Sequence, residues 1–208
     1  MFNTKIILST IMVVVGLNAL ANSPAATQSK TTAIANNTEK TITFKSTDGK
    51  TEFTAVGKPA MIKIGGEGEG PEGTAKVDKD LVQLDVKVNL EKLSTKIDLR
   101  DEHMKNKYLE VAKYPVANLV IKDLKLKESL DGLALDKDLE VPFKGDLTLH
   151  GKTQPVTGTA VIKKQGTQII GSADFTIKIM EHLDTLPTWA GIKVADEVKV
   201  KVSFKGAM

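Results

Sequence analysis

The stretch Leu147-Thr-Leu-His-Gly-Lys-Thr-Gln-Pro-Val156 combines an alternating run, a turn and a second extended run. Leu147 and Leu149 are expected on one side of an extended chain, because successive side chains of a strand alternate between two faces. His150 and Gly151 mark a turn that reverses the chain. The stretch therefore predicts a β-hairpin with one buried and one exposed face.

The same two-residue period recurs along much of the chain. Apolar side chains occupy alternate positions within residues 84–90, 139–149, 169–179 and 198–204. Strands that are covered on both faces show continuous apolar runs instead, so this alternation favours an antiparallel sheet with one wet face.

About eight or nine such strands are expected, with turn residues between them. Residues 116–126 also alternate, but with a change of phase that predicts a β-bulge near Asp123. Strands with one apolar face form either a sandwich or a closed barrel. Closure leaves no unpaired edge, and eight strands enclose room for one small ligand. The residues therefore predict an all-β antiparallel fold of about eight strands, and both a sandwich and an eight-stranded barrel satisfy the pattern.

Two segments depart from the alternation. Residues 93–115 predict a short helical insertion, capped by Ser94 or Asp98 and ended by Pro115. Residues 65–73 contain five glycines and predict a flexible connection or a bulged edge. They lack the lysine and hydroxyl residue of a phosphate loop, and their glutamates would repel phosphate.

The N-terminus predicts export. Lys5 precedes an apolar run, and Ala19-Leu-Ala21 offers a site for signal peptidase. We expect a signal peptide over residues 1–21, a flexible leader over residues 22–40 and the barrel domain over residues 41–208. The chain contains no cysteine, so the expected periplasmic protein holds its fold without disulfides.

Charge and composition exclude some partners. The formal net charge is +3 and the lysines are spread along the strands, opposite the apolar positions. A nucleic-acid-binding protein would gather its basic residues on one face, so nucleic acid is not an expected partner. The apolar N-terminal run is short for a membrane span, and no stable membrane insertion is expected after signal cleavage.

Three stretches, in order, resemble the YceI-like family of bacterial lipid-binding proteins, and the resemblance covers residues 41–205. They are residues 93–115 with Arg100-Asp-Glu-His103, the hairpin at residues 145–156, and Val194-Ala-Asp-Glu-Val198. The resemblance implies a lipocalin-like barrel around an elongated apolar tunnel. It implies a bound polyisoprenoid, a quinone-like molecule or a fatty-chain amphiphile, no other cofactor, no enzymatic activity and a possible homodimer.

Under this reading the inward side chains line the tunnel, although the same residues would form an ordinary core if the barrel were solid. Arg100 and His103 are expected either to contact a ligand headgroup or to tie the barrel end together. The only tryptophan lies in a loop that diverges from the family, either as a lid over the tunnel mouth or as packing at the rim. No histidine spacing predicts a metal site. The expected tunnel-lining residues are Val86, Val88, Leu119, Ile121, Phe143, Leu149, Phe175, Ile177, Trp189 and Val202.

We expect a periplasmic carrier for a long apolar molecule. The alternative is a structural or stress-response barrel that binds nothing and is filled by its own side chains.

We predict that the exported protein begins at Asn22, because Ala19 and Ala21 are the small residues that signal peptidase reads. N-terminal sequencing of the protein recovered from the periplasm checks this. Recovery of a chain that still begins at Met1 would contradict the assignment.

Overall fold

The computed structural model describes residues 39–59 and 61–208. The expected signal peptide, and the leader up to residue 38, lie outside the described residues. Within the described part, all helices are short, and none combines the length and apolarity that a membrane-spanning helix requires.

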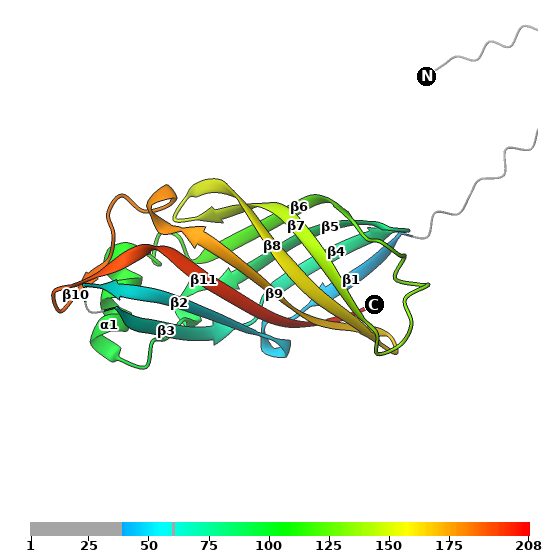
Figure 1. Ribbon diagram of the computed structural model, residues 1–208, viewed down its shortest axis with the longest axis horizontal. Helices are drawn as coiled ribbons and strands as arrows, with labels where there is room; N and C mark the ends of the chain where they lie inside the picture. The colour runs from blue at the N-terminus through cyan, green and yellow to red at the C-terminus, as the bar shows by residue number, and fades with distance from the viewer. Residues whose placement is uncertain (1–38, 60) are drawn as a thin grey trace, which may run out of the picture. The chain divides into compact units, whose positions relative to one another are not determined.

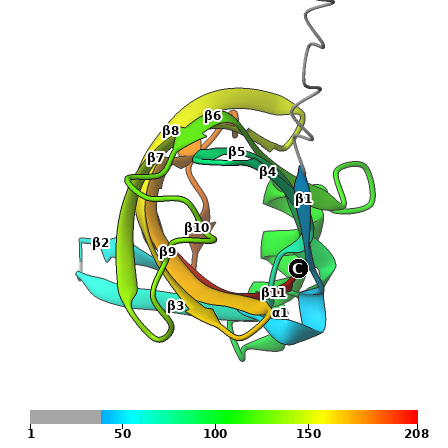
Figure 2. The ribbon, with the colours of Figure 1, turned by 90° about the vertical axis from the view of Figure 1, so that its right-hand side faces the viewer.

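Eight antiparallel strands form a closed ring in the order β1-β4-β5-β6-β7-β8-β9-β11, and β11 pairs back to β1 (Figures 1 and 2). This confirms the predicted antiparallel barrel. The strands of the ring are β1 (Lys40–Phe44), β4 (Glu72–Asp78), β5 (Leu81–Asn89), β6 (Val116–Lys125), β7 (Asp138–Leu149), β8 (Lys152–Gln165), β9 (Gln168–Lys178) and β11 (Ile192–Ala207).

The pairing between β1 and β11 that closes the barrel is short. β1 and β11 pair only at Thr43 with Ala207 and Phe44 with Gly206. Over the rest of its length β11 pairs instead with β2 (Lys50–Lys58), and β2 pairs with β3 (Ile62–Glu69). A short strand, β10 (Thr188–Trp189), also pairs with the start of β11.

The helical insertion covers the outer edge of β3. Main-chain hydrogen bonds join Glu67 N to Ser94 O at 2.9 Å and Ser94 N to Glu67 O at 2.8 Å. The insertion comprises a 3-10 turn at Leu90–Lys92, helix α1 (Asp98–Glu102) and a π-helical turn at His103–Tyr108. A helical insertion was predicted here, but neither predicted cap is used: Ile97 precedes α1, and no side chain caps it.

The opposite end of the barrel is plugged. The segment between β6 and β7 crosses this end (Figure 2), and its Leu126, Leu130 and Leu133 are buried. They pack in one cluster with inward residues of β1, β4, β5 and β7. A second cluster occupies the half of the barrel next to the insertion.

The glycine-rich run was predicted as a flexible connection or bulged edge. It forms most of β3, which is the last strand in the sheet order and pairs with β2 without a bulge, and the start of β4. Its glycines make room for larger neighbours. A Cβ on Gly66 would lie 2.3 Å from the Phe53 ring, and a Cβ on Gly68 would lie 2.8 Å from the Leu93 side chain. The absence of side chains thus lets Phe53 and the insertion pack against the strand.

The predicted bulge is confirmed. β5 pairs with β6 through Val82 with Leu124 and Leu84 with Ile121, so β6 carries an extra residue near Asp123. The extra residue lets apolar side chains on both sides of the bulge face the interior.

Gly158 on β8 provides a test of how tightly the wall is packed. A Cβ there would lie 2.6 Å from both the Phe143 ring and the carbonyl oxygen of Asp174. We predict that Gly158→Ala lowers the free energy of unfolding by about 1–3 kcal/mol, as overpacking does. Thermal or urea unfolding measures this. The control is Gly132→Ala, whose Cβ would meet nothing closer than 3.5 Å. Equal stability of the two variants would contradict this packing.

Candidate ligand-binding site

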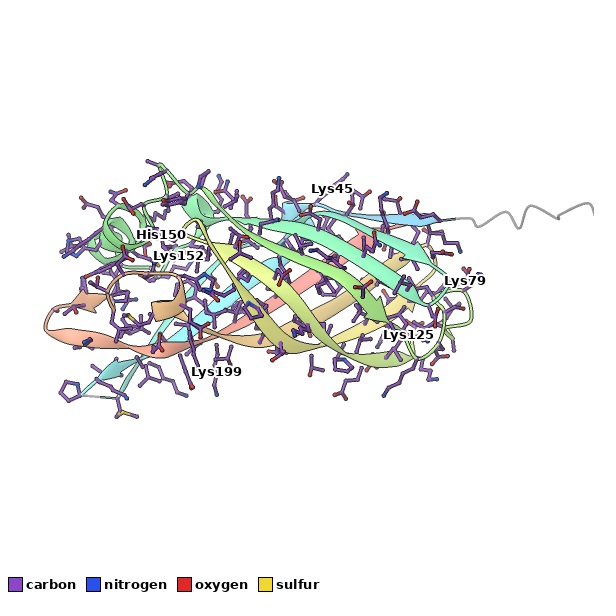
Figure 3. The ribbon with its side chains drawn as sticks, turned by 90° about the horizontal axis from the view of Figure 1, so that it is seen from above. Lys45, Lys79, Lys125, His150, Lys152 and Lys199 are labelled. Atoms are coloured by element: carbon purple, nitrogen blue, oxygen red, sulfur yellow. The ribbon has the colours of Figure 1, made fainter. Side chains whose placement is uncertain are left out.

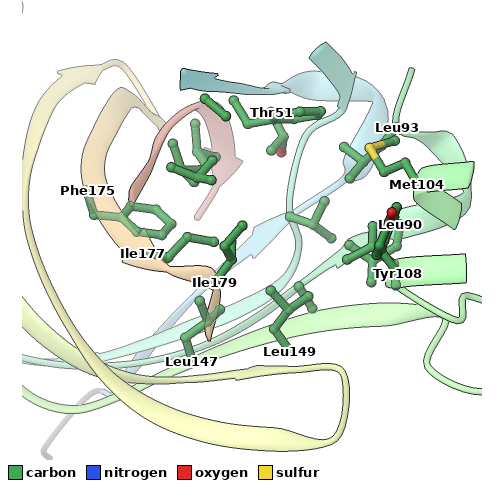
Figure 4. Close-up of a pocket in the computed structure, with 18 of the residues that line it drawn as sticks. Thr51, Leu90, Leu93, Met104, Tyr108, Leu147, Leu149, Phe175, Ile177 and Ile179 are labelled. Atoms are coloured by element: carbon green, nitrogen blue, oxygen red, sulfur yellow. The ribbon is translucent and has the colours of Figure 1, made fainter. Parts of the chain in front are cut away.

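A cavity of about 290 Å³ lies inside the half of the barrel next to the insertion (Figure 4). We refer to it as the lumen cavity. Its walls come from inward side chains of the strands and from the insertion. Two aromatic residues of its lining, Phe44 and Phe204, stand edge to face with ring centroids 5.7 Å apart. Both also pack against the cluster of the plugged end, so they form the floor of the cavity.

The lining is apolar except at two places. One is the mouth, where the insertion meets the loop before β11; it contributes Thr95, Arg100, His103, Tyr108, Thr188 and Trp189. The other is Thr51, on β2. Such a surface suits a long apolar chain with few polar groups, because polar side chains are confined to two parts of the lining.

The mouth is held together by side chains of two distant segments. Tyr108 donates its hydroxyl proton to the carbonyl oxygen of Thr188 at 3.0 Å, and the amide of Thr188 donates to the Tyr108 hydroxyl at 3.0 Å. The Arg100 guanidinium lies over the Trp189 ring, 5.7 Å from its centroid. These contacts place the tryptophan in the wall of the mouth.

Hydrogen bonds to Thr95 also hold the Arg100 side chain in place. Its Nε donates to Thr95 Oγ1 and its Nη2 to the carbonyl oxygen of Thr95, each at 2.8 Å. Arg100 therefore ties residues of the insertion together, and it also belongs to the lining of the cavity. The four residues from Arg100 to His103 do not converge on one point, since Asp101 faces back toward residues 94–95.

Asp101 is the acceptor at the centre of the insertion. Ser94 Oγ and the amide of Thr95 each donate to its carboxylate at 2.7 Å. Burial disfavours the charged form, but the hydrogen bonds from Thr95 and Ser94 outweigh it, so the pKa of this carboxyl lies below its usual value.

Most of the predicted residues surround the lumen cavity. Trp189, Arg100 and His103 lie at its mouth. Whether any of them contacts a ligand stays a prediction. Seven strand residues line the wall: Val86, Val88, Leu119, Leu149, Phe175, Ile177 and Val202.

Two predicted residues, Ile121 and Phe143, are buried in the wall but do not line the cavity. Ile121 packs over Gly145, whose Cβ would lie 2.8 Å from the isoleucine side chain. Phe143 extends across Gly158 and meets Phe175 with ring centroids 6.1 Å apart. Each fills the space that a glycine leaves beside it.

Sequence reasoning missed the contribution of β2, and within the insertion it named only Arg100 and His103. Thr51, Phe53 and Ala55 line the cavity, and their spacing was a readable two-residue alternation. From the insertion, Met104 also lines the cavity, whereas Leu99 is 56% exposed. The π-helical turn that begins at His103 changes which residues share a face.

The other two histidines have structural surroundings. His150 Nε2 lies 2.5 Å from Glu110 Oε2, and its ring lies 4.6 Å from that of Tyr114. His182 is almost fully buried, with Nδ1 at 3.1 Å from the carbonyl oxygen of Lys152; Figure 3 labels His150 and Lys152. Within residues 39–59 and 61–208, no three histidine or carboxylate side chains gather as a metal site would require.

The Asp101 carboxylate makes the insertion sensitive to acid. Because its folded-state pKa is lowered, it stabilises the protein above its usual pKa of 3.8, and this stabilisation is lost as the pH falls through the folded-state pKa. We predict that Asp101→Asn lowers the melting temperature at about pH 7, and that the difference shrinks below about pH 4. The exposed neighbour Glu102, as Glu102→Gln, is the control. A difference that is constant with pH would contradict the assignment.

Comparison with known proteins agrees with this architecture. A family profile of the YceI-like domain matches residues 23–206. No curated protein matches the chain.

Two solved structures show the same fold. A polyisoprenoid-binding domain from Saccharophagus degradans, implicated in plant cell wall breakdown, is 17% identical with a TM-score of 0.61 and covers 80% of this chain and 97% of its own. BcnA from Burkholderia cenocepacia is 20% identical with a TM-score of 0.55, over 74% of this chain and 95% of its own. Because the family profile spans nearly all of the sequence, the chain belongs to the YceI-like family.

Proposed function

We propose that the protein binds a long, mostly apolar molecule in the lumen cavity and carries or stores it in the periplasm. The observation that supports this most directly is an apolar cavity inside a barrel that is plugged at one end and bordered by polar side chains at the other. A molecule with a long hydrocarbon part and one polar group matches that distribution.

Burial alone supplies enough affinity. Each 100 Å² or so of apolar ligand surface removed from water contributes about 2.5 kcal/mol. A long chain offers several times this area, which offsets the cost of immobilising it. The lumen walls are mainly Leu, Val, Ile and Phe side chains, which contact a chain closely without requiring one particular shape.

The class of ligand follows from the same features and from the comparisons. The domain from Saccharophagus degradans is described as polyisoprenoid-binding, which supports a polyisoprenoid, a quinone-like molecule or a fatty-chain amphiphile for this chain. The periplasmic location rests on the predicted signal peptide over residues 1–21.

Binding rather than catalysis fits the ionisable groups of the lining. Arg100, His103 and Tyr108 are the ionisable side chains of the described lining; Arg100 is already engaged with Thr95, and Tyr108 with Thr188. A general acid or base would need to reach a reacting atom, and the rest of the described lining holds only apolar side chains and threonine hydroxyls.

The direct test is solvent extraction of the purified protein followed by mass spectrometry. We expect a long-chain compound in an amount close to one per protein chain. Extracts that match those of an unrelated protein purified in parallel, together with failure of the delipidated protein to take up isoprenoid or fatty chains, would contradict the proposal.

A substitution that fills the cavity tests the location of binding. Ala173 on β9 lines the lumen cavity. We predict that Ala173→Phe weakens uptake of a long-chain ligand at least tenfold. Thr176→Phe, on the outward face of the same strand, is the control and should bind normally. The emission of Trp189, the only tryptophan, reports uptake in both variants. Equal affinities would place the ligand elsewhere.

A further inference from the structure

One polar group of the lumen cavity has no partner. Thr51 is 7% exposed, and its Oγ1 makes no hydrogen bond with any group of residues 39–59 and 61–208. It lines the cavity, and Figure 4 shows its hydroxyl oxygen turned toward the open space. The main chain of Thr51 is in register with Gly68 on one side and Val202 on the other. The backbone of Thr51 is therefore part of the sheet ladders, whereas its hydroxyl makes no hydrogen bond.

The position of this hydroxyl is deep in the cavity. Thr51 lies seven residues before Lys58, the end of β2, which corresponds to about 23 Å of extended chain. Its neighbours on the lumen face are apolar: Val202 stands opposite on β11, and Phe53 follows on the same strand. Thr95 lies at a similar depth, because Ser94 pairs with Glu67 and Glu67 pairs with Glu52, but its hydroxyl is already hydrogen-bonded to Asp101 and Arg100. Thr51 is thus the polar side chain of the described lining that lies near the floor and has no partner.

A buried hydroxyl without a partner destabilises a protein relative to an apolar side chain of the same shape. Valine has that shape and favours strands at least as well. A lone water molecule is a poor partner here, since a buried water needs two to four polar contacts and the adjacent wall offers one. A polar group of the ligand would supply the hydrogen-bond partner that the Thr51 hydroxyl lacks.

We propose that Thr51 Oγ1 is a hydrogen-bonding subsite for a polar group at the inner end of the ligand. The preferred ligand is then a long chain with a hydroxyl, carbonyl or amide group at the end that enters first, rather than a plain hydrocarbon end. This inference rests on the proposed function and adds to it the chemistry and orientation of the ligand.

The test compares two probes of equal chain length, octadecanol and octadecane. The delipidated protein is exposed to an equimolar mixture, and the bound ratio is measured by extraction and mass spectrometry. Dividing the ratio of the wild-type protein by that of Thr51→Val cancels the different solubilities of the probes. We expect the wild type to favour the alcohol about 3- to 10-fold more than the variant does, as one net hydrogen bond would.

Two further measurements separate the hydroxyl from the shape of the side chain. Thr51→Ser keeps the hydroxyl and should keep most of the preference for the alcohol. The melting temperature of ligand-free Thr51→Val should equal or exceed that of the wild type, because an unpaired buried hydroxyl is removed without leaving a cavity.

The outcomes are distinguishable. Equal ratios for the wild type and Thr51→Val overturn the subsite while leaving apolar binding in place. A lower melting temperature of ligand-free Thr51→Val also overturns it, because the hydroxyl then has a structural partner. Retention of neither probe by the wild type overturns the proposed function together with the subsite.

Discussion

The structure depends on how a sheet with one apolar face closes on itself. Only two residue pairs join β1 to β11, and along the rest of β11 the neighbouring strand is β2. β3 is then left with an edge that the ring does not cover, and the main chain of Ser94 pairs with it at Glu67. Because an unpaired edge is unfavourable, the helical insertion becomes part of the wall. The lumen cavity is lined there by sheet and insertion together.

The cavity lies in the half of the barrel whose interior is not crossed by the segment between β6 and β7. Ile121 and Phe143 pack beside Gly145 and Gly158 and are not part of its lining. At the other end, Leu126, Leu130 and Leu133 of that segment are buried among the inward side chains of the strands. The same alternating pattern therefore produces a solid core in one half of the barrel and a cavity in the other.

This division explains what could be predicted from the sequence. The period-two alternation of β5, β7, β9 and β11 is a local property, and it was sufficient for the antiparallel strands and most of the wall, while the choice of a barrel came from the family resemblance. The glycine-rich run was predicted only in part, as an edge, because the partners that occupy its free space, Phe53 and Leu93, are distant in sequence. The same holds for Ile121 and Phe143. The unpaired state of Thr51 is likewise invisible in the sequence, since it depends on what lies across the lumen.

The mouth and the wall of the cavity are held together by different kinds of interaction. The wall is held by continuous ladders of main-chain hydrogen bonds, as between β7 and β8, whereas the insertion meets the loop before β11 through Tyr108 with Thr188 and through Arg100 with Trp189. Separating the two sides of the mouth breaks a few side-chain contacts and leaves every ladder intact. For a molecule that leaves the cavity through the mouth, the contacts of Tyr108 and Arg100 would therefore govern the rate of dissociation, while the ladders of the wall govern the stability of the folded barrel.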